Sequence, residues 1–170
     1  MYVGEPRFTT HKRFTRRSPS AAKAEDEKLP VLPINPVYTA DVTASGGRKG
    51  RAVSSDGVLD LQLKSPGASG DPKATNPEQL FAAGYAACFQ NSLMTVARRA
   101  SEDVSESTVR AEVSLGKVDS DLFGLAVRLT VHIPGLDLAR AQELADAAHV
   151  RCPYSQATRG NIEVKVVAAE

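Results

Sequence analysis

Cysteine is scarce in this chain, which holds only two in 170 residues and no tryptophan. That count excludes the disulfide-dense framework of small secreted domains. The first 30 residues lack a secretory apolar segment, and no apolar run approaches the roughly 20 residues that cross a bilayer. A net charge of +1 provides no overall field for nucleic acid or a membrane surface. We therefore expect a cytoplasmic protein with no nucleic-acid or membrane partner, whose two cysteines are catalytic, metal-binding or inert.

Residues 1–36 differ in composition from the rest of the chain. Their first 20 residues contain one acid, Glu5, and little periodic apolar character, and three prolines follow between residues 30 and 36. This composition predicts a mobile extension over residues 1–36, followed by one domain over residues 37–170. The basic, Ser/Thr-containing start also allows an organelle transit signal, although Glu5 and weak amphipathicity count against it. The basic residues of this start are Arg7, Lys12, Arg13, Arg16 and Arg17.

From Val37 onward, regular patterns predict an element order of βββ-α-ββ-α-β. Asp56-Gly57 is a strong hairpin signal between two short strands. The most helix-like segment begins at Asn76, a good N-cap that Pro77 and Glu78 follow, and its apolar middle predicts burial on most sides. Hairpins in place of βαβ units favour an α+β fold of antiparallel strands packed on a central helix. The predicted strands are residues 37–43, 51–54, 58–64, 109–115, 125–133 and 162–167, and the helices are residues 76–99 and 137–149.

Cys88 lies within the apolar helix and has two interpretations. A cysteine in such a helix is commonly a small packing residue. A reactive thiol there needs a positive partner, because burial alone raises the pKa of a thiol. Arg48 is a candidate partner, since glycines at positions 46, 47 and 50 let its loop turn sharply. On spacing alone this loop is equally a solvated basic turn.

Cys152 follows the second helix, where Pro153 prevents the helix from continuing. His149 and Cys152 have a spacing that suits a metal, but two cysteines without a second clustered histidine leave a structural zinc short of ligands. We therefore expect no metal. Neither cysteine belongs to a C-x-x-C motif, so a thioredoxin-like redox site is not indicated.

Residues 75–89 end in Cys88-Phe89, and residues 152–162 begin with Cys152-Pro153-Tyr154-Ser155. These two long segments resemble the signatures of the organic hydroperoxide resistance (Ohr) branch of the Ohr/OsmC family. The likeness extends over about residues 37–167. It implies the Ohr/OsmC-like fold, with antiparallel sheets packed on central helices and two chains intertwined as a homodimer.

The resemblance also implies a role for each of four residues. Cys88 falls on the peroxidatic cysteine and Cys152 on the resolving one. Arg48 falls on the arginine that activates the thiolate, and Glu78 on the acid that orients this arginine. The expected activity is reduction of organic hydroperoxides in preference to hydrogen peroxide, without a bound cofactor. The expected reductant is an external dithiol, dihydrolipoamide or a lipoylated protein.

Aromatic residues near the two motifs suggest an apolar pocket for an alkyl or fatty-acyl chain, although core packing explains each of them equally well. In a single straight helix, Glu78 and Cys88 would lie about 15 Å apart along the axis. The two would then share one arginine only if the helix breaks near Gly84, if Arg48 spans part of the gap, or if the acid comes from the other subunit. We favour the break. The pocket candidates are Phe81, Tyr85, Phe89 and Phe123.

Two rival functions remain at this point. An OsmC-type thiol peroxidase would have similar residues and a broader range of peroxides, and Cys152-Pro153-Tyr154-Ser155 argues against it. A non-enzymatic module that binds lipids or small molecules would use both cysteines for packing.

Overall fold

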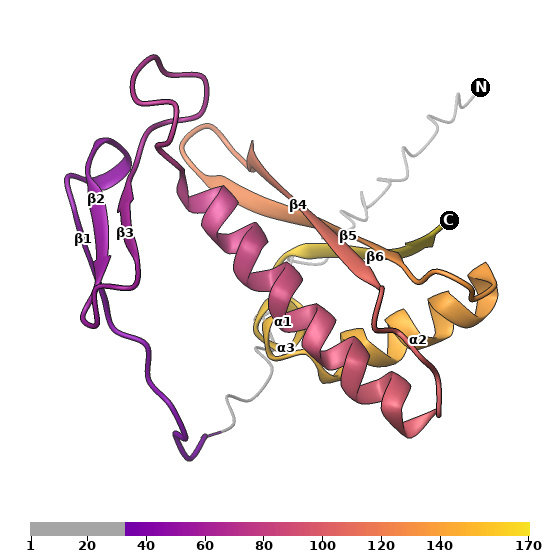
Figure 1. Cartoon of the computed structure of the whole chain (residues 1–170). Helices are drawn as coiled ribbons and strands as arrows, with labels where there is room; N and C mark the ends of the chain where they lie inside the picture. The colour runs from indigo at the N-terminus through magenta and orange to yellow at the C-terminus, as the bar shows by residue number, and fades with distance from the viewer. Residues whose placement is uncertain (1–32) are drawn as a thin grey trace, which may run out of the picture. The chain divides into compact units, whose positions relative to one another are not determined.

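A computed structural model describes residues 33–170 (Figure 1). The extension predicted over residues 1–36 falls outside the described residues except for its last four, which are exposed and lack regular structure. The basic segment of this extension, for which a transit signal was the alternative interpretation, lies wholly outside the described residues. The elements below all belong to the unit Asn35–Glu170.

The first sheet has the antiparallel order β1-β2-β3. The predicted hairpin is confirmed, with Gly57 in the left-handed region at a φ of 73°. The strand predicted over residues 37–43 begins only at Val42, and Tyr38 is 79% exposed. A short 3-10 helix, η1, connects the first two strands. The bounds are β1 (Val42–Ser45), η1 (Gly47–Lys49), β2 (Arg51–Ser54) and β3 (Asp60–Gln62).

Helix α1 (Pro77–Arg99) confirms the predicted central helix and its start. The Asn76 side chain accepts a hydrogen bond from the Gln79 N–H at 2.9 Å, which satisfies one of the free donors of the first turn. One face of α1 is buried, and it carries Tyr85, Phe89, Leu93 and Ala97, which follow one another at intervals of four residues.

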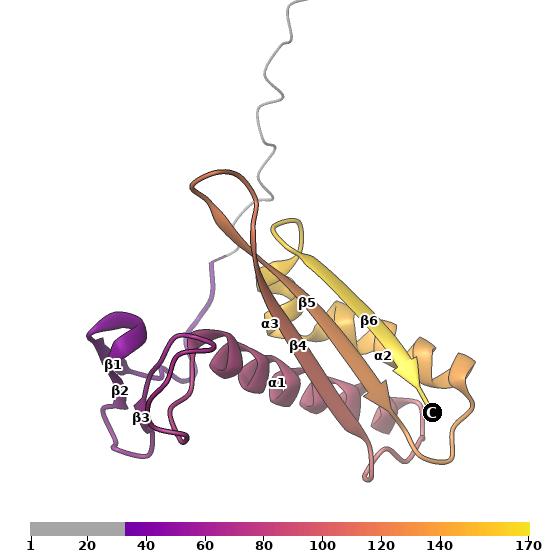
Figure 2. The same ribbon diagram turned by 90° about the horizontal axis from the view of Figure 1, so that it is seen from above.

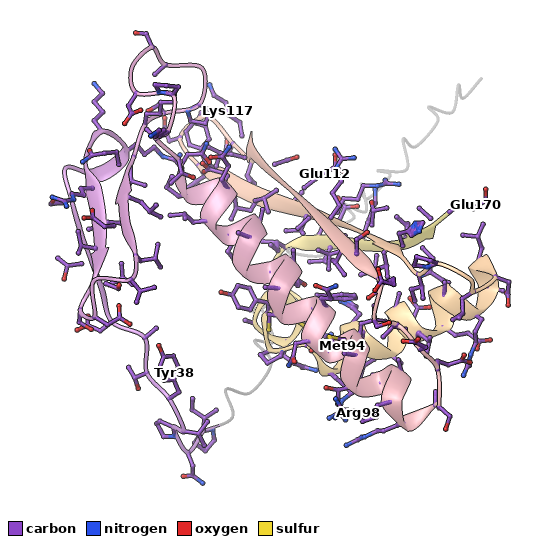
Figure 3. The ribbon with its side chains drawn as sticks, in the orientation of Figure 1. Tyr38, Met94, Arg98, Glu112, Lys117 and Glu170 are labelled. Atoms are coloured by element: carbon purple, nitrogen blue, oxygen red, sulfur yellow. The ribbon has the colours of Figure 1, made fainter. Side chains whose placement is uncertain are left out.

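One narrow face of α1 is exposed in this single chain, whereas most of the predicted apolar middle, residues 80–93, is buried or half-buried. Ala83, Ala87 and Asn91 are exposed there. Met94 and Arg98 are exposed as well, and Figure 3 labels them on this helix. No helix within residues 33–170 combines the length and the apolar character that a membrane span requires.

The second sheet has the order β4-β5-β6, and helices α1, α2 and α3 lie on one of its faces (Figure 2). Strands β4 and β5 form the predicted hairpin. Strand β6 pairs with β5 in parallel, so the expectation of antiparallel strands alone is wrong for this pair. Parallel neighbours need a crossover, and α2 with α3 supplies it. The bounds are β4 (Thr108–Lys117), β5 (Phe123–His132), α2 (Leu138–Arg151), α3 (Pro153–Thr158) and β6 (Glu163–Ala169).

The core lies between this sheet and the helices. Val127, Leu129 and Val131 alternate along β5 and are buried beneath α1 and α2. Each such aliphatic side chain contributes about 1.5–3 kcal/mol when fully buried. Cys152 belongs to the same core, and Cys88 packs against it. The α+β class is therefore confirmed, and its core brings Cys88, on α1, close to Cys152, directly after α2.

Candidate active site

The two cysteines form a close pair of free thiols. Cys88 lies in the middle of α1, and Cys152 is the single residue between α2 and α3. Their sulfur atoms are 3.7 Å apart. A disulfide needs about 2.05 Å between the sulfurs, so an approach of about 1.7 Å would close the bond. The structure thus brings together the two thiols that the sequence motifs singled out.

Burial governs the chemistry of the Cys88 thiol. Removal from water raises the pKa of Cys88, and the neighbouring Cys152 raises it further. The backbone N–H of Tyr154, in the first turn of α3, opposes this and lowers the pKa. Burial is the largest of these effects, so the residues around Cys88 in this chain favour the neutral thiol. A reactive thiolate needs an additional positive charge.

Arg48 and Glu78 form the second pair of the predicted site. The guanidinium donates two hydrogen bonds to the carboxylate, Nη1 to Oε2 at 2.7 Å and Nη2 to Oε1 at 2.5 Å. This forked contact fixes the plane of the arginine. The Arg48 hydrogen bond is the main cause that lowers the pKa of Glu78, while burial opposes it. Glu78 is therefore an anion at neutral pH, and its side chain is 12% exposed against 39% for Arg48.

Glycines shape the loop that carries Arg48. Gly46 has a φ of 70°, which is in the left-handed region that favours glycine. At Gly50, a Cβ atom would lie 1.7 Å from the Ser45 carbonyl oxygen. The glycines noted in the sequence therefore permit the tight turn that presents Arg48 beside the start of α1.

The two pairs are separate within one chain, because α1 runs unbroken from Pro77 to Arg99. The predicted break near Gly84 is wrong. Ten residues of regular helix place Glu78 and Cys88 about 15 Å apart along the axis, and about 80° apart around it. The groups that shift the pKa of Cys88 do not include Arg48. The guanidinium bound to Glu78 thus lies at the N-terminal end of α1, away from Cys88 of the same chain.

Gly84 has a packing role in place of the predicted hinge. A Cβ atom at this position would lie 2.7 Å from the Tyr154 hydroxyl oxygen and 3.3 Å from its Cζ. Glycine at this point lets α3, which carries Tyr154, pack closely on α1. The sequence signal was correct in marking a special position, but the requirement is a close approach between helices.

Replacing Gly84 with alanine is expected to destabilise the protein by about 1 kcal/mol. Alanine gains about 1 kcal/mol in helix propensity, while the overpacked contact costs about 1–3 kcal/mol. In a Tyr154→Phe background the nearest obstacle is gone, so the same change should become neutral or stabilising. Chemical denaturation of the four proteins of this cycle measures the difference. An equal effect of Gly84→Ala in both backgrounds would refute the proposed contact.

The four predicted pocket residues differ in their surroundings. Phe81 and Tyr85 pack together with Tyr154, at ring-centroid distances of 5.9 Å for Phe81–Tyr85 and 5.5 Å for Tyr85–Tyr154. Tyr85 and Phe89 are fully buried in the core, whereas Phe123, at the start of β5, is 64% exposed. Sequence reasoning missed Tyr154 as an aromatic neighbour, although it stands in the motif that begins at Cys152.

The surface hollow and the side-chain clusters within the described part of the chain offer no second candidate active site. A surface hollow of about 450 Å³ lies beside Lys49 and residues 62–74, and its lining includes none of the four predicted catalytic residues. Within residues 33–170, no three His, Cys, Asp or Glu side chains gather closely enough to hold a metal ion.

Comparisons with known proteins agree with the motifs. The profile of the family described as OsmC-like protein matches residues 70–167. The organic hydroperoxide resistance protein of Xanthomonas axonopodis pv. citri (strain 306) is 49% identical over 142 residues, which cover 81% of this chain and 98% of that protein. The crystal structure of the organic hydroperoxide resistance protein OhrB of Bacillus subtilis superposes with a TM-score of 0.74 at 48% identity, covering 79% of this chain and all of that one.

Proposed function

Because this chain belongs to the Ohr/OsmC family, we propose that it is a cysteine-based peroxidase that reduces organic hydroperoxides to alcohols. The observation that carries the proposal is the pair of free thiols with sulfurs 3.7 Å apart. Relatives at about half identity that are named for resistance to organic hydroperoxides support the choice of substrate.

In the first step, the Cys88 thiolate attacks one peroxide oxygen. The S–O bond forms as the O–O bond breaks, and the other oxygen leaves as alkoxide and takes up a proton to become the alcohol. The sulfur is oxidised by two electrons to a sulfenic acid, and the peroxide is reduced by two. A guanidinium stabilises both the thiolate and the charge that develops on the leaving oxygen.

In the second step, Cys152 condenses with the sulfenic acid. The S–S bond forms, the sulfenic oxygen leaves as water with the Cys152 proton, and no further oxidant is needed. An external dithiol then reduces the disulfide by exchange, and we propose dihydrolipoamide or a lipoylated protein for this role. The cycle requires no bound cofactor and suits a reducing cytoplasm.

We propose that the working site is completed in an intertwined homodimer. The Arg48–Glu78 pair lies about 15 Å along α1 from Cys88 of its own chain, too far for one guanidinium to serve both. Cys88 is partly exposed, and so is the neighbouring side of α1. A second copy packed on this side would place its own Arg48, still held by Glu78, beside the thiol. The cation that burial of Cys88 demands would then come from the partner subunit.

The substrate class is tested by comparing kcat/KM for cumene hydroperoxide, a fatty-acid hydroperoxide and hydrogen peroxide. An apolar group that is recognised contributes about ten- to 200-fold, so the organic substrates should be favoured by at least tenfold. Each assay contains dihydrolipoamide, which reduces the disulfide after each cycle so that turnover can be followed. Equal efficiency for all three would favour the OsmC-type general peroxidase. Binding of the organic molecules without turnover would favour a non-enzymatic lipid-binding module.

A further inference from the structure

A hydrogen bond bridges the joint at which Cys152 lies. Cys152 is fully buried between α2 and α3, with His149 in the last turn of α2 and Ser155 in the first turn of α3. His149 Nδ1 and Ser155 Oγ are 2.8 Å apart. The bond thus joins the residues three before and three after the thiol. It fixes the angle at which the two helices meet.

The same hydroxyl is tied to the helix that carries the other thiol. Tyr85 OH donates to Ser155 Oγ at 3.0 Å, and both residues are fully buried. Tyr85 precedes Cys88 by three residues on α1, so the two lie about one helical turn apart. Each cysteine therefore lies near a member of one hydrogen-bonded chain, Tyr85–Ser155–His149, which we call the clamp; its first two members are buried and His149 is half-buried.

One arrangement of the hydrogen atoms links all three members of the clamp. Thr158 also lies 3.2 Å from Tyr85 OH, but its own hydroxyl donates to the carbonyl oxygens of Tyr154 and Ser155. In this arrangement Tyr85 donates to Ser155, and Ser155 donates to His149 Nδ1, which accepts. The imidazole is then neutral, with its proton on Nε2.

The surroundings of His149 favour that neutral form. Burial is the main cause that lowers the pKa of His149, and the positive charge of Arg159 lowers it further. Asp146, one turn earlier on α2, acts in the opposite direction and is the weakest of the three effects. Arg159 also donates to the His149 carbonyl oxygen at 3.1 Å, a second tie between α3 and the end of α2.

We propose that Tyr85, Ser155 and His149 are positioning residues that hold Cys152 against Cys88 and set the rate at which the disulfide closes. This inference rests on the proposed peroxidase cycle and concerns its second step. Condensation of Cys88–SOH with Cys152–SH forms the S–S bond and releases water, and its rate depends on how often the sulfurs approach from 3.7 Å. Apolar packing alone tolerates small rotations of α3, whereas a directional chain of hydrogen bonds does not.

The test compares four variants by rapid quench after one equivalent of cumene hydroperoxide. Ser155→Ala removes the central hydroxyl, His149→Leu removes the acceptor, and His149→Asn replaces Nδ1 with an amide oxygen. Ser92→Ala is the matched control, because Ser92 is also a buried serine but its hydroxyl donates to the Cys88 carbonyl of its own helix. Dimedone trapping and mass spectrometry report sulfenic acid and disulfide separately.

Ser155→Ala and His149→Leu should slow closure of the disulfide about tenfold, while oxidation of Cys88 stays within about twofold of wild type. His149→Asn should recover most of the closure rate, and Ser92→Ala should leave it unchanged. Closure at the wild-type rate in both Ser155→Ala and His149→Leu would overturn the proposal. So would an equal slowing of both steps, which is the result of a role in stability alone.

A second measurement separates this inference from the peroxidase proposal. Equilibration with reduced and oxidised dithiothreitol closes the Cys88–Cys152 bond without any peroxide, and the ratio of species gives the effective concentration of the two thiols. Loss of the clamp should lower that concentration about tenfold. If wild-type Cys88 failed to react with hydroperoxides, the peroxidase would be refuted while this equilibrium still tested the clamp. Identical equilibria for wild type and Ser155→Ala would refute the clamp.

Discussion

Replacing Cys88 with serine is expected to lower kcat/KM for an alkyl hydroperoxide by about 10⁴-fold or more. The loss is large because a hydroxyl stays protonated where a thiol can ionise, and because removal of a nucleophile leaves little residual catalysis. The substitution changes one atom in a partly buried position, so the fold should persist. Steady-state turnover and circular dichroism on the same preparation check both expectations.

Cys152→Ser is the matched variant of the second thiol, with a different expected result. It should complete the first step and then stop, because no partner remains to condense with the sulfenic acid. One equivalent of hydroperoxide should consume two thiols in the wild type and one in Cys152→Ser. Full peroxidase activity in Cys88→Ser would refute the proposed mechanism and support the binding module.

Replacing Arg48 with lysine is expected to lower kcat/KM at neutral pH by about 10²–10³-fold, although the charge is kept. Lysine lacks the planar fork that binds the Glu78 carboxylate with two parallel bonds, so its charge is not held in place. Burial already raises the pKa of Cys88, and loss of a well-placed cation leaves only the Tyr154 N–H to oppose that effect. Because the thiolate reacts, the rate should recover as the pH rises through the elevated thiol pKa.

Glu78→Gln keeps the shape of the acid and tests its orienting role. It should lower activity less than Arg48→Lys and shift the pH profile in the same direction. A mixture of Cys88→Ser and Arg48→Lys chains, refolded together, locates the arginine. If the cation comes from the partner subunit, mixed dimers regain one complete site and part of the activity. Unchanged pH profiles in both single variants would refute activation of the thiol by this pair.

Local sequence signals correctly predicted the elements whose ends carry a characteristic turn or capping residue. The Asp56-Gly57 turn fixes the β2–β3 pairing, and Asn76 with Pro77 fixes the start of α1, since a turn type or a cap depends on only a few neighbouring residues. The proximity of Cys88 and Cys152 followed from family motifs. The apolar pattern and the residue spacing of a sequence do not give the distance between two helices.

Features set by packing between distant segments were missed. The parallel pairing of β6 depends on the crossover through α2 and α3, which alternation within β6 does not encode. Gly84 is isolated in a helical pattern and is equally consistent with a hinge or a close approach, and only the position of Tyr154 decides between them. The contact between Arg48 and Glu78, by contrast, was expected from the family motifs, although local patterns do not show the path of the loop that precedes β2.

Cys152 is sealed in the interior, yet its sulfur already touches that of Cys88. Bond formation across so small a gap requires no part of the protein to open toward water. We expect the disulfide to form with the hydrophobic core closed, and the external dithiol to attack at Cys88, which is the partly exposed sulfur. We therefore expect oxidised chains to expose no additional apolar surface on which neighbouring chains could aggregate.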